Sequence, residues 1–246
     1  MSTSNARAST MSRLTGRIAL VTGASRGIGA AVAKRFAAEG AHVILAARTV
    51  GGLEETDDAI FQATGRNATL VPLDLRQFDK IDQLGFSIYE RFGKLDILVS
   101  NAGVLEALGP VAHYDPKLWQ RVMDVNVTAN YRLIRSFDRL LRTSESGRAI
   151  FVTSGAAHAP YPYWSPYGAS KAALEMMVKT YAMEIAASNL RVNLIDPGIV
   201  ATKLRMQAFP GEDQTKLAQP DDVTEAFVEL AEASCTRHGE VVSAQG

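Results

Sequence analysis

Tyr167 and Lys171 are the two residues whose types and spacing best fit a catalytic pair. They lie four positions apart in a segment expected to be helical, so the ammonium group lies beside the phenol on one helix face. A free tyrosine has a pKa of about 10, and a neighbouring positive charge lowers that pKa by stabilising the phenolate. The pair is therefore suited to exchanging a proton with a carbonyl or an alcohol. Two residues at this spacing are common by chance, so the surrounding elements must decide the interpretation.

A glycine-rich turn comes before the first expected helix. It reads Thr22-Gly23-Ala24-Ser25-Arg26-Gly27-Ile28-Gly29, and helical spacing follows directly at residues 30–39. Glycine permits a tight turn and the close approach of a ligand, and a helix N-terminus offers unpaired N–H groups to a phosphate. The spacing G-x3-G-x-G differs from the G-x-G-x-x-G fingerprint, so a turn without a ligand is the alternative. Its position between a strand and a helix favours a pyrophosphate site.

The end of the second expected strand bears on which dinucleotide such a site takes. A cofactor with a free ribose 2′-hydroxyl usually meets an acidic residue there, whereas this chain has Ala47 followed by Arg48. A guanidinium matches a phosphate in charge and geometry, and Arg26 in the glycine turn is placed to reach the same group. We therefore predict that NADP(H) is preferred over NAD(H). The alternative is that both arginines are solvated surface charges.

Two further strand ends carry residues placed to contact the same cofactor. Asp74 and Leu75 follow the third expected strand, at the position expected to meet an adenine ring. Asn101, Ala102 and Gly103 follow the fourth, where small residues let the backbone pass close to a ligand. Each of these residues taken alone is also an ordinary turn signal.

Apolar, β-branched runs of strand length alternate with segments of helical spacing along the chain. This alternation predicts the α/β class: a doubly wound parallel seven-stranded sheet, or Rossmann fold, with helices on both faces. Ligands bind beyond the carboxyl ends of the strands in such a sheet, which is where the turns above fall. Asp115-Pro116 and Ser165-Pro166 are expected helix starts, each with a capping side chain before proline. The expected strands are residues 17–22, 42–47, 68–73, 95–100, 148–154, 190–195 and 240–244.

Length and composition limit the class of protein. The chain has 246 residues, 47% of them hydrophobic and 21% charged, so we expect one domain over residues 14–246 behind a flexible tail of residues 1–13. The formal net charge is zero, so no global field favours nucleic acid or an anionic membrane. The single cysteine excludes an intrachain disulfide, and no apolar run is long enough to span a bilayer, which suits a cytoplasmic protein. No metal-ligand spacing occurs, so no metal is expected.

The distances between these features are informative as a set. Ser154 ends the fifth expected strand 13 residues before Tyr167, and Asn126 lies 28 residues before Ser154. Pro197 and Gly198 follow the sixth expected strand, 30 and 31 residues after Tyr167. With the glycine turn and the Asn-Ala-Gly segment, this set resembles the short-chain dehydrogenase/reductase family. The resemblance covers residues from about 14 to 246.

The resemblance implies an NADP(H)-dependent oxidoreductase that interconverts a carbonyl and an alcohol by hydride transfer, with Tyr167 as general acid or base. Ser154 would bind the substrate oxygen. Lys171 would bind the nicotinamide ribose hydroxyls and lower the pKa of Tyr167. Asn126 would kink its helix and hold a water of a proton relay. The segment 197–202 would bind the nicotinamide carboxamide.

The family likeness also implies a small-molecule substrate and assembly as a homodimer or homotetramer. The chain's last residues depart from the family's usual ending, which leaves the details of assembly open. The expected cofactor contacts are Gly23, Ser25, Arg26, Gly27, Ile28, Gly29, Arg48, Asp74, Leu75, Asn101, Ala102, Gly103, Tyr167, Lys171, Pro197, Gly198 and Thr202.

The substrate and two other functions stay open. Tyr161, Tyr163 and Trp164 either line an apolar pocket or pack against a lid or a neighbouring subunit. The expected lid at 203–219 is short and polar, which argues against a large acyl carrier, although a 3-oxoacyl-thioester reductase remains an alternative. A nucleotide-sugar epimerase or dehydratase would need a longer chain. A non-catalytic NADP(H)-binding sensor would be expected to lack the tyrosine or the lysine, and turnover of a carbonyl substrate separates it from an enzyme.

Overall fold

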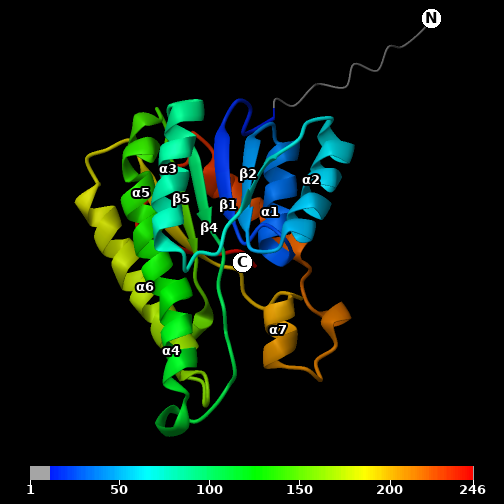
Figure 1. The fold of residues 1–246 in the computed structure, drawn as a ribbon, viewed down its shortest axis with the longest axis vertical. Helices are drawn as coiled ribbons and strands as arrows, with labels where there is room; N and C mark the ends of the chain where they lie inside the picture. Colours follow the sequence, from blue (N-terminus) through cyan, green and yellow to red (C-terminus); the bar gives the residue numbers. More distant parts are fainter. Residues whose placement is uncertain (1–11, 246) are drawn as a thin grey trace, which may run out of the picture.

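A computed structural model describes residues 12–245 of the chain. Seven strands form one sheet in the order β3-β2-β1-β4-β5-β6-β7 (Figure 1). Every neighbouring pair of strands is parallel, so the predicted doubly wound seven-stranded Rossmann sheet is confirmed. The strands are β1 (Ile18–Thr22), β2 (His42–Ala47), β3 (Thr69–Pro72), β4 (Ile97–Ser100), β5 (Arg148–Val152), β6 (Arg191–Asp196) and β7 (Val241–Ser243).

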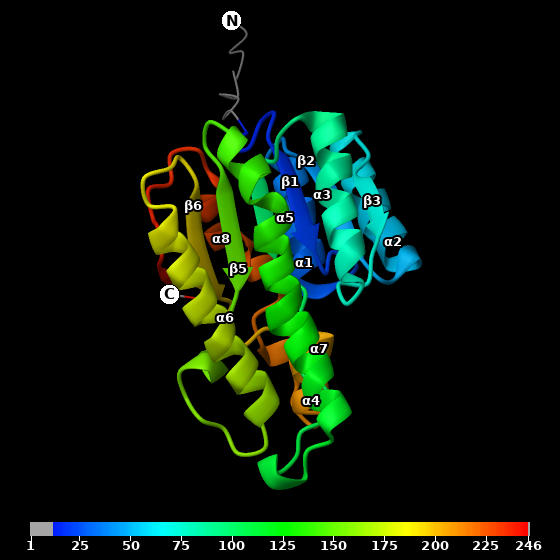
Figure 2. The same cartoon turned by 60° about the vertical axis from the view of Figure 1, so that its left-hand side comes forward.

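Helices cover both faces of the sheet, as predicted. Figures 1 and 2 show α3, α5 and α6 on one face, and α1, α2 and α8 on the other. The shorter α4 and α7 extend beyond the carboxyl edge of the sheet. The helices are α1 (Gly27–Ala38), α2 (Val50–Thr64), α3 (Phe78–Phe92), α4 (Pro116–Met123), α5 (Ala129–Thr143), α6 (Ser165–Glu184), α7 (Lys203–Ala208) and α8 (Thr224–Ala231).

Successive strand residues supply the two hydrophobic cores alternately. In β1, Ala19 and Val21 belong to the core shared with α1 and α8, whereas Leu20 belongs to the core shared with α3 and α5. Side chains along a strand point to opposite faces, and both faces of this sheet are covered. The strands are therefore continuous apolar runs, which is why their positions could be predicted.

The fifth strand is shorter than predicted. It ends at Val152, so Ser154 lies two residues beyond the strand instead of ending it. The backbone N–H of Thr153 still donates to Ile195 of β6 (2.8 Å), and the chain then turns. The hydroxyl of Ser154 accepts from the backbone N–H of Ala156 (3.3 Å) and caps a short 3₁₀ helix, η3 (Gly155–Ala157). This local hydrogen bond competes with extension of the strand.

The predicted helix starts have different outcomes. Asp115 caps α4 as expected, because its carboxylate accepts from the backbone N–H of Lys117 (2.7 Å). Ser165 is instead the first residue of α6, and Trp164 occupies the cap position without a side-chain hydrogen bond. α1 begins at Gly27, three residues before the predicted start, so the glycine turn itself forms the first turn of the helix.

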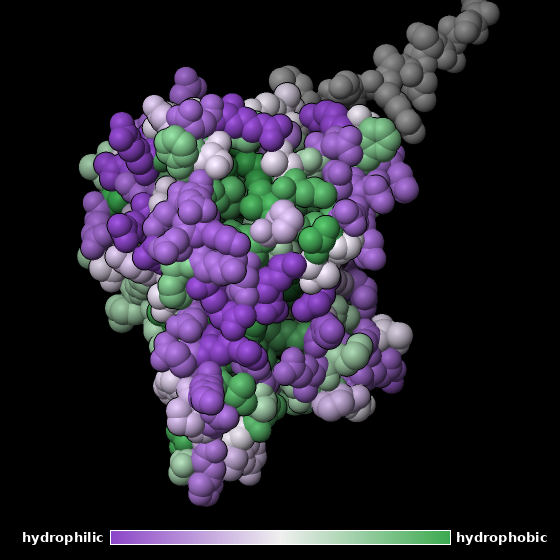
Figure 3. Space-filling model, viewed as in Figure 1, coloured by the Kyte–Doolittle hydropathy of each residue, from purple (hydrophilic) through white to green (hydrophobic). Residues whose placement is uncertain are grey.

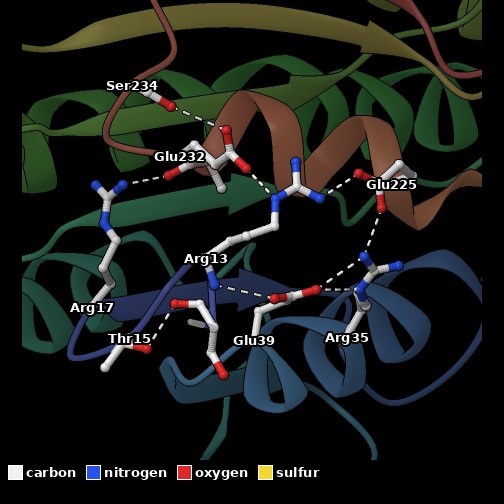
Figure 4. Close-up of polar contacts among 10 residues, drawn as sticks. Arg13, Thr15, Arg17, Arg35, Glu39, Glu225, Glu232 and Ser234 are labelled. Atoms are coloured by element: carbon white, nitrogen blue, oxygen red, sulfur yellow. Dashed lines mark hydrogen bonds and ion pairs between the residues drawn. The ribbon is translucent and has the colours of Figure 1, made fainter. Parts of the chain in front are cut away.

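The chain joins the fold earlier than predicted. Arg13, assigned to the flexible tail, donates from its backbone N–H to Glu39 at the end of α1 (3.2 Å). Its guanidinium pairs with Glu225 of α8 and with Glu232 just beyond that helix (Figure 4). Two carboxylates at the guanidinium and a third at the backbone N–H anchor Arg13, so this residue packs with the fold instead of belonging to the expected tail. The rest of the predicted tail, residues 1–11, lies outside the described residues.

Candidate active site

A cavity opens at the carboxyl edge of the sheet, beyond the neighbouring strands β1 and β4. The strand order reverses at this pair, and such a switch point is where ligands bind in doubly wound sheets. A recessed apolar area lies between the segment after β4 and α7 (Figure 3). The predicted site residues that line the cavity are Gly23, Ser25, Arg26, Gly27, Ile28, Arg48, Asp74, Leu75, Asn101, Ala102, Gly103, Ser154, Tyr167, Lys171, Pro197, Gly198 and Thr202.

Three of the four predicted catalytic side chains meet in this cavity. Tyr167 of α6 is 7% exposed, and the Ser154 side chain lies near enough to its hydroxyl to lower its pKa. Lys171, one turn further along α6, donates from Nζ to the carbonyl oxygen of Val152 (2.7 Å). The ammonium nitrogen lies 5.7 Å from the centroid of the Tyr167 ring. The helix thus brings the phenol and the ammonium together, and the end of β5 brings the serine hydroxyl to the phenol.

The ionisation of this pair differs from the expectation. Burial raises the pKa of Tyr167 to about 12, Asp196 adds to the rise, and the Ser154 side chain opposes it. Burial lowers the pKa of Lys171 to about 8, against the opposing charges of Asp196 and Glu175. The net pKa of Tyr167 is therefore raised in the chain alone, and the lowering expected from Lys171 stays a prediction. Desolvation of the phenolate outweighs an ammonium that lies over the ring and is bonded to a carbonyl.

Asn126 lies behind the cavity wall instead of on it. It is fully buried in a π-helical turn, η2 (Asp124–Thr128), which interrupts the helix between α4 and α5. Its Oδ1 accepts from the backbone N–H of Val104, and its Nδ2 donates to the Val104 carbonyl oxygen (both 2.9 Å) and to Ser170 Oγ (3.0 Å). The side chain fixes the segment after β4 against α6. Its implied part in a proton relay stays a prediction.

The glycine turn has the conformation that a phosphate site needs. Gly23 and Gly27 have positive φ angles of 69° and 56°, which side chains rarely adopt. A Cβ on Gly23 would lie 2.8 Å from Asn101 Nδ2, so the backbone segments after β1 and β4 approach closely. Gly29 does not line the cavity, and a Cβ there would clash with Asn101 and with the Gly23 carbonyl. Close packing by itself requires glycine at this position, and the expected contact of Gly29 with the cofactor stays a prediction.

Two arginines of this region line the cavity, and a third binds a carboxylate of its wall. Arg26 and Arg48 both line the cavity. Arg76, which no motif singled out, binds the Asp74 carboxylate with an Nη2–Oδ2 distance of 2.7 Å. This contact lowers the pKa of Asp74 more than the weaker attraction of Arg48 does. The carboxylate is therefore held as an anion beside the predicted adenine position.

The segments after β4 and β6 are tied down by their own hydrogen bonds. Asn101 Nδ2 donates to the Thr22 carbonyl oxygen (2.9 Å), so this side chain joins β4 to β1. Thr202 Oγ1 accepts from the backbone N–H of Arg205 (3.1 Å) and caps α7, which leaves its O–H as a donor. Gln245 Nε2 donates to the carbonyl oxygens of Pro197 and Ile199 (both 2.9 Å). The chain's end thus fixes the predicted carboxamide-binding loop, a role that no sequence signal indicated.

The apolar wall beside Tyr167 was only partly predicted. The Trp164 ring meets the Tyr167 ring edge-on, with centroids 5.8 Å apart, and lies 5.8 Å from Phe209 beyond α7. Trp164 lines the cavity, whereas Tyr161 and Tyr163 are 53% and 59% exposed. The remaining apolar residues at this end are Leu105 and Leu204, from the segment after β4 and from α7. They come from distant parts of the chain and carried no sequence signal.

The fold and the cavity together define a dinucleotide-dependent oxidoreductase of the Rossmann type. The sequence profile of the short chain dehydrogenase family matches residues 17–213. An uncharacterized oxidoreductase of Escherichia coli (strain K12), YciK, is 38% identical over 219 residues, covering 88% of this chain and 86% of that protein. The chain belongs to the short-chain dehydrogenase family and is an NAD(P)-dependent enzyme.

Solved structures agree with this assignment. A short chain dehydrogenase from Escherichia coli CFT073 complexed with NADPH has a TM-score of 0.92 at 37% identity, covering 96% of this chain and 99% of that one. Another from Shigella flexneri 2a, complexed with NADP, has a TM-score of 0.92 at 36% identity, covering 96% of this chain and 100% of that one.

Within residues 12–245, no helix is long and apolar enough to cross a membrane. Among the same residues, no group of three or more His, Cys, Asp or Glu side chains is placed to hold a metal ion.

Proposed function

We propose that the protein binds NADPH and reduces the carbonyl group of a small apolar molecule to an alcohol, with Tyr167 as the general acid. The observation that carries the proposal is the convergence of Ser154, Tyr167 and Lys171 in one cavity with the glycine turn. A nucleotide site without this convergence would fit a binding protein equally well. The structural relatives solved with NADP or NADPH support the choice of cofactor.

The residues of the cavity fit an NADP(H) cofactor. The two glycines with positive φ leave the backbone uncovered where a pyrophosphate would approach the N-terminus of α1. Arg26 and Arg48 would bind the 2′-phosphate, since both line the cavity near this turn. Asp74 and Leu75 would contact the adenine, and Pro197 to Thr202 the nicotinamide end. When bound, the cofactor supplies the hydride.

The chain's own residues manage the proton. Tyr167, with its pKa near 12, keeps its proton at neutral pH and donates it from its hydroxyl to the substrate oxygen. Ser154 donates a second hydrogen bond to the same oxygen and orients the carbonyl. The Lys171 ammonium stabilises the phenolate that forms when the proton leaves. A tyrosine that retains its proton favours the reductive direction near neutral pH.

The apolar wall narrows the substrate. Trp164, Leu105 and Leu204 surround the side of the cavity next to the Tyr167 ring, so the group attached to the carbonyl is expected to be apolar. A 3-oxoacyl thioester remains the second candidate, because Lys203 and Arg205 also line this end and suit a phosphate-bearing carrier group. A sensor without turnover is the third.

One assay separates these candidates. The purified protein is incubated with NADPH and a panel of apolar ketones, aldehydes and 3-oxoacyl thioesters, and the loss of NADPH absorbance is followed. Preferred turnover of apolar ketones or aldehydes supports the proposal, and preferred turnover of thioesters replaces it with the second candidate. Tight NADPH binding with no turnover of any compound favours the sensor.

We also propose that the protein acts in the cytoplasm as a homodimer or homotetramer. Large apolar side chains are exposed on one face, including Tyr131 of α5 and Met176 and Met183 of α6. Exposed apolar residues on neighbouring helices are typical of a surface covered by another subunit. Light scattering coupled to size-exclusion chromatography gives the mass in solution, and a monomer at micromolar concentration would contradict the proposal.

A further inference from the structure

Glu175 is a buried carboxylate that the proposed mechanism does not use. It lies one helical turn after Lys171 on α6 and is 4% exposed. Its Oε1 accepts from Thr153 Oγ1 (2.7 Å) and lies 2.9 Å from His158 Nε2, and its Oε2 lies 3.0 Å from Lys179 Nζ. Burying a charge is costly unless several partners compensate for it. A buried carboxylate with three partners is therefore expected to have a role besides filling space.

Two of these partners lie on either side of Ser154. Thr153 immediately precedes the serine, and His158 follows it by four residues in the turn after η3. Lys179 lies on α6 itself, so its contact with Glu175 ties the helix only to itself. The carboxylate therefore closes a short loop, 153–158, against the helix that carries Tyr167.

A second contact from α6 supports the same segment. Lys171 donates to the carbonyl oxygen of Val152, the residue before Thr153. Two successive residues at the end of β5 are thus bound by side chains one turn apart on α6. Beyond them, η3 is fastened locally, with backbone hydrogen bonds from Ala157 to Ser154 (2.9 Å) and from His158 to Gly155 (3.0 Å). Of the bonds named here, the one between His158 and Glu175 is the only one that connects the residues after η3 to α6.

We propose that Glu175 is a positioning residue, which fixes Ser154 against Tyr167 by binding Thr153 on one side of the serine and His158 on the other. His158 is the part of this device that can be removed without leaving a buried cavity, because its side chain is 53% exposed. The role of Ser154 in the reaction rests on the proposed function, whereas the fixing of segment 153–158 does not.

The test compares His158→Ala with His158→Gln and Lys179→Ala. Lys179→Ala is the matched control, because it removes the contact of the same carboxylate with Lys179 but leaves the contact with the loop. His158→Gln keeps a side-chain N–H that can donate to Glu175. Hydrogen exchange of the backbone amides of residues 155–159 is measured by mass spectrometry, with the melting temperature and the Kd of NADPH as checks on folding and on cofactor binding.

His158→Ala is expected to speed exchange in this segment at least fivefold and to lower kcat about tenfold, with melting temperature and NADPH affinity unchanged. His158→Gln is expected to restore both values to within about twofold of the wild type, and Lys179→Ala to leave both unchanged. Equal exchange in His158→Ala and the wild type overturns the proposal, and so does faster exchange without a loss of kcat in an active enzyme. Exchange needs no substrate, so a protein that turns over no carbonyl refutes the proposed function while the exchange pattern still decides whether Glu175 fixes the loop.

Discussion

The two edges of the sheet both bury cationic side chains, but they use them differently. At the amino edge, Arg17 and Arg148 are 7% and 3% exposed and donate to backbone carbonyls. At the carboxyl edge, Lys171 is 4% exposed. Within residues 12–245, its ammonium group, which has three N–H donors, makes one hydrogen bond, to the carbonyl oxygen of Val152. The amino edge is saturated, whereas the carboxyl edge keeps donors for a ligand. We propose that this difference separates residues that stabilise the fold from residues that take part in the reaction.

The side chain of Arg148 has acceptors for all of its N–H groups. Its guanidinium donates to five carbonyl oxygens, with distances from 2.6 to 3.4 Å. Three of the acceptors, Glu232, Ala233 and Cys235, belong to the turn between α8 and β7. Arg17 binds Ala231 at the end of α8 and Ser146 before β5 in the same way. These two arginines attach the last helix and its turn to the start of the sheet, where no cavity is needed.

Tyr167→Phe tests the carboxyl edge with the largest expected effect. Removing the hydroxyl removes the proposed proton donor, so kcat is expected to fall about 1,000-fold, or roughly 4 kcal/mol in the activation free energy. The ring and its edge-on contact with Trp164 are kept, so the melting temperature and NADPH affinity are expected to stay near wild type. Steady-state kinetics with the best substrate of the panel gives the answer.

Tyr163→Phe is the matched control for that experiment. Tyr163 belongs to the same aromatic stretch but is 59% exposed, and it is expected to retain full activity. Full activity in Tyr167→Phe would show that another group supplies the proton.

Arg148→Met tests the amino edge. The apolar side chain fills part of the volume but leaves several buried carbonyls without a donor, so the free energy of unfolding is expected to fall by about 3 kcal/mol. Activity per folded molecule should not change, because Arg148 lies at the opposite end of β5 from Ser154. Urea denaturation followed by circular dichroism measures the loss. Arg142→Met, whose side chain is 48% exposed, is expected to change stability by less than about 0.5 kcal/mol. An equal loss in both variants would contradict the assignment of the amino edge to stability.

The strands and the two ends of the cavity also differ in how well the sequence predicted them. The central strands β1, β2, β4 and β5 could be located because each is a nearly continuous apolar run buried on both faces. Most residues of the proposed cofactor end could be predicted to line one cavity because each group directly follows a strand in one contiguous turn. The sequence did not show that Gly29 must also lack a side chain in order to pack against Asn101.

The substrate end and the amino edge could not be predicted in the same way. Leu105, Leu204 and Phe209 come together only when the segment after β4 meets α7. Arg148 is a charged residue at the start of an apolar run, and the five carbonyls that pair with it are main-chain atoms that leave no trace in sequence. The ionisation of Tyr167 depends on burial, which spacing does not reveal.

Arg48→Ala tests whether the open end of the cavity selects NADPH by charge. Losing one guanidinium from the predicted 2′-phosphate site is expected to raise the Kd of NADPH about 30-fold, or roughly 2 kcal/mol, since hydrogen bonds to charged groups contribute about this much. The Kd of NADH should change less than about twofold, because it has no phosphate at that position. Quenching of tryptophan fluorescence measures both. Arg139→Ala, an exposed arginine on α5, is the control. A parallel loss for both cofactors would show that Arg48 stabilises the site without reading the phosphate.

The pH dependence of kcat/KM gives the smallest effect and separates the two edges by ionisation. Lys171 has its pKa lowered to about 8 by burial, so it loses its charge as the pH rises through that value. The rate of reduction is therefore expected to fall about tenfold per pH unit above pH 8. Tyr167, with its pKa near 12, and Arg17, with its pKa lowered by burial to about 10, both remain protonated at pH 9. Stability should not fall with activity, because a lysine whose pKa is lowered on folding favours the folded state more as it deprotonates. A loss of rate above pH 8 with an undiminished melting temperature assigns the change to the carboxyl edge, and a flat profile up to pH 10 would show that the Lys171 charge is not required.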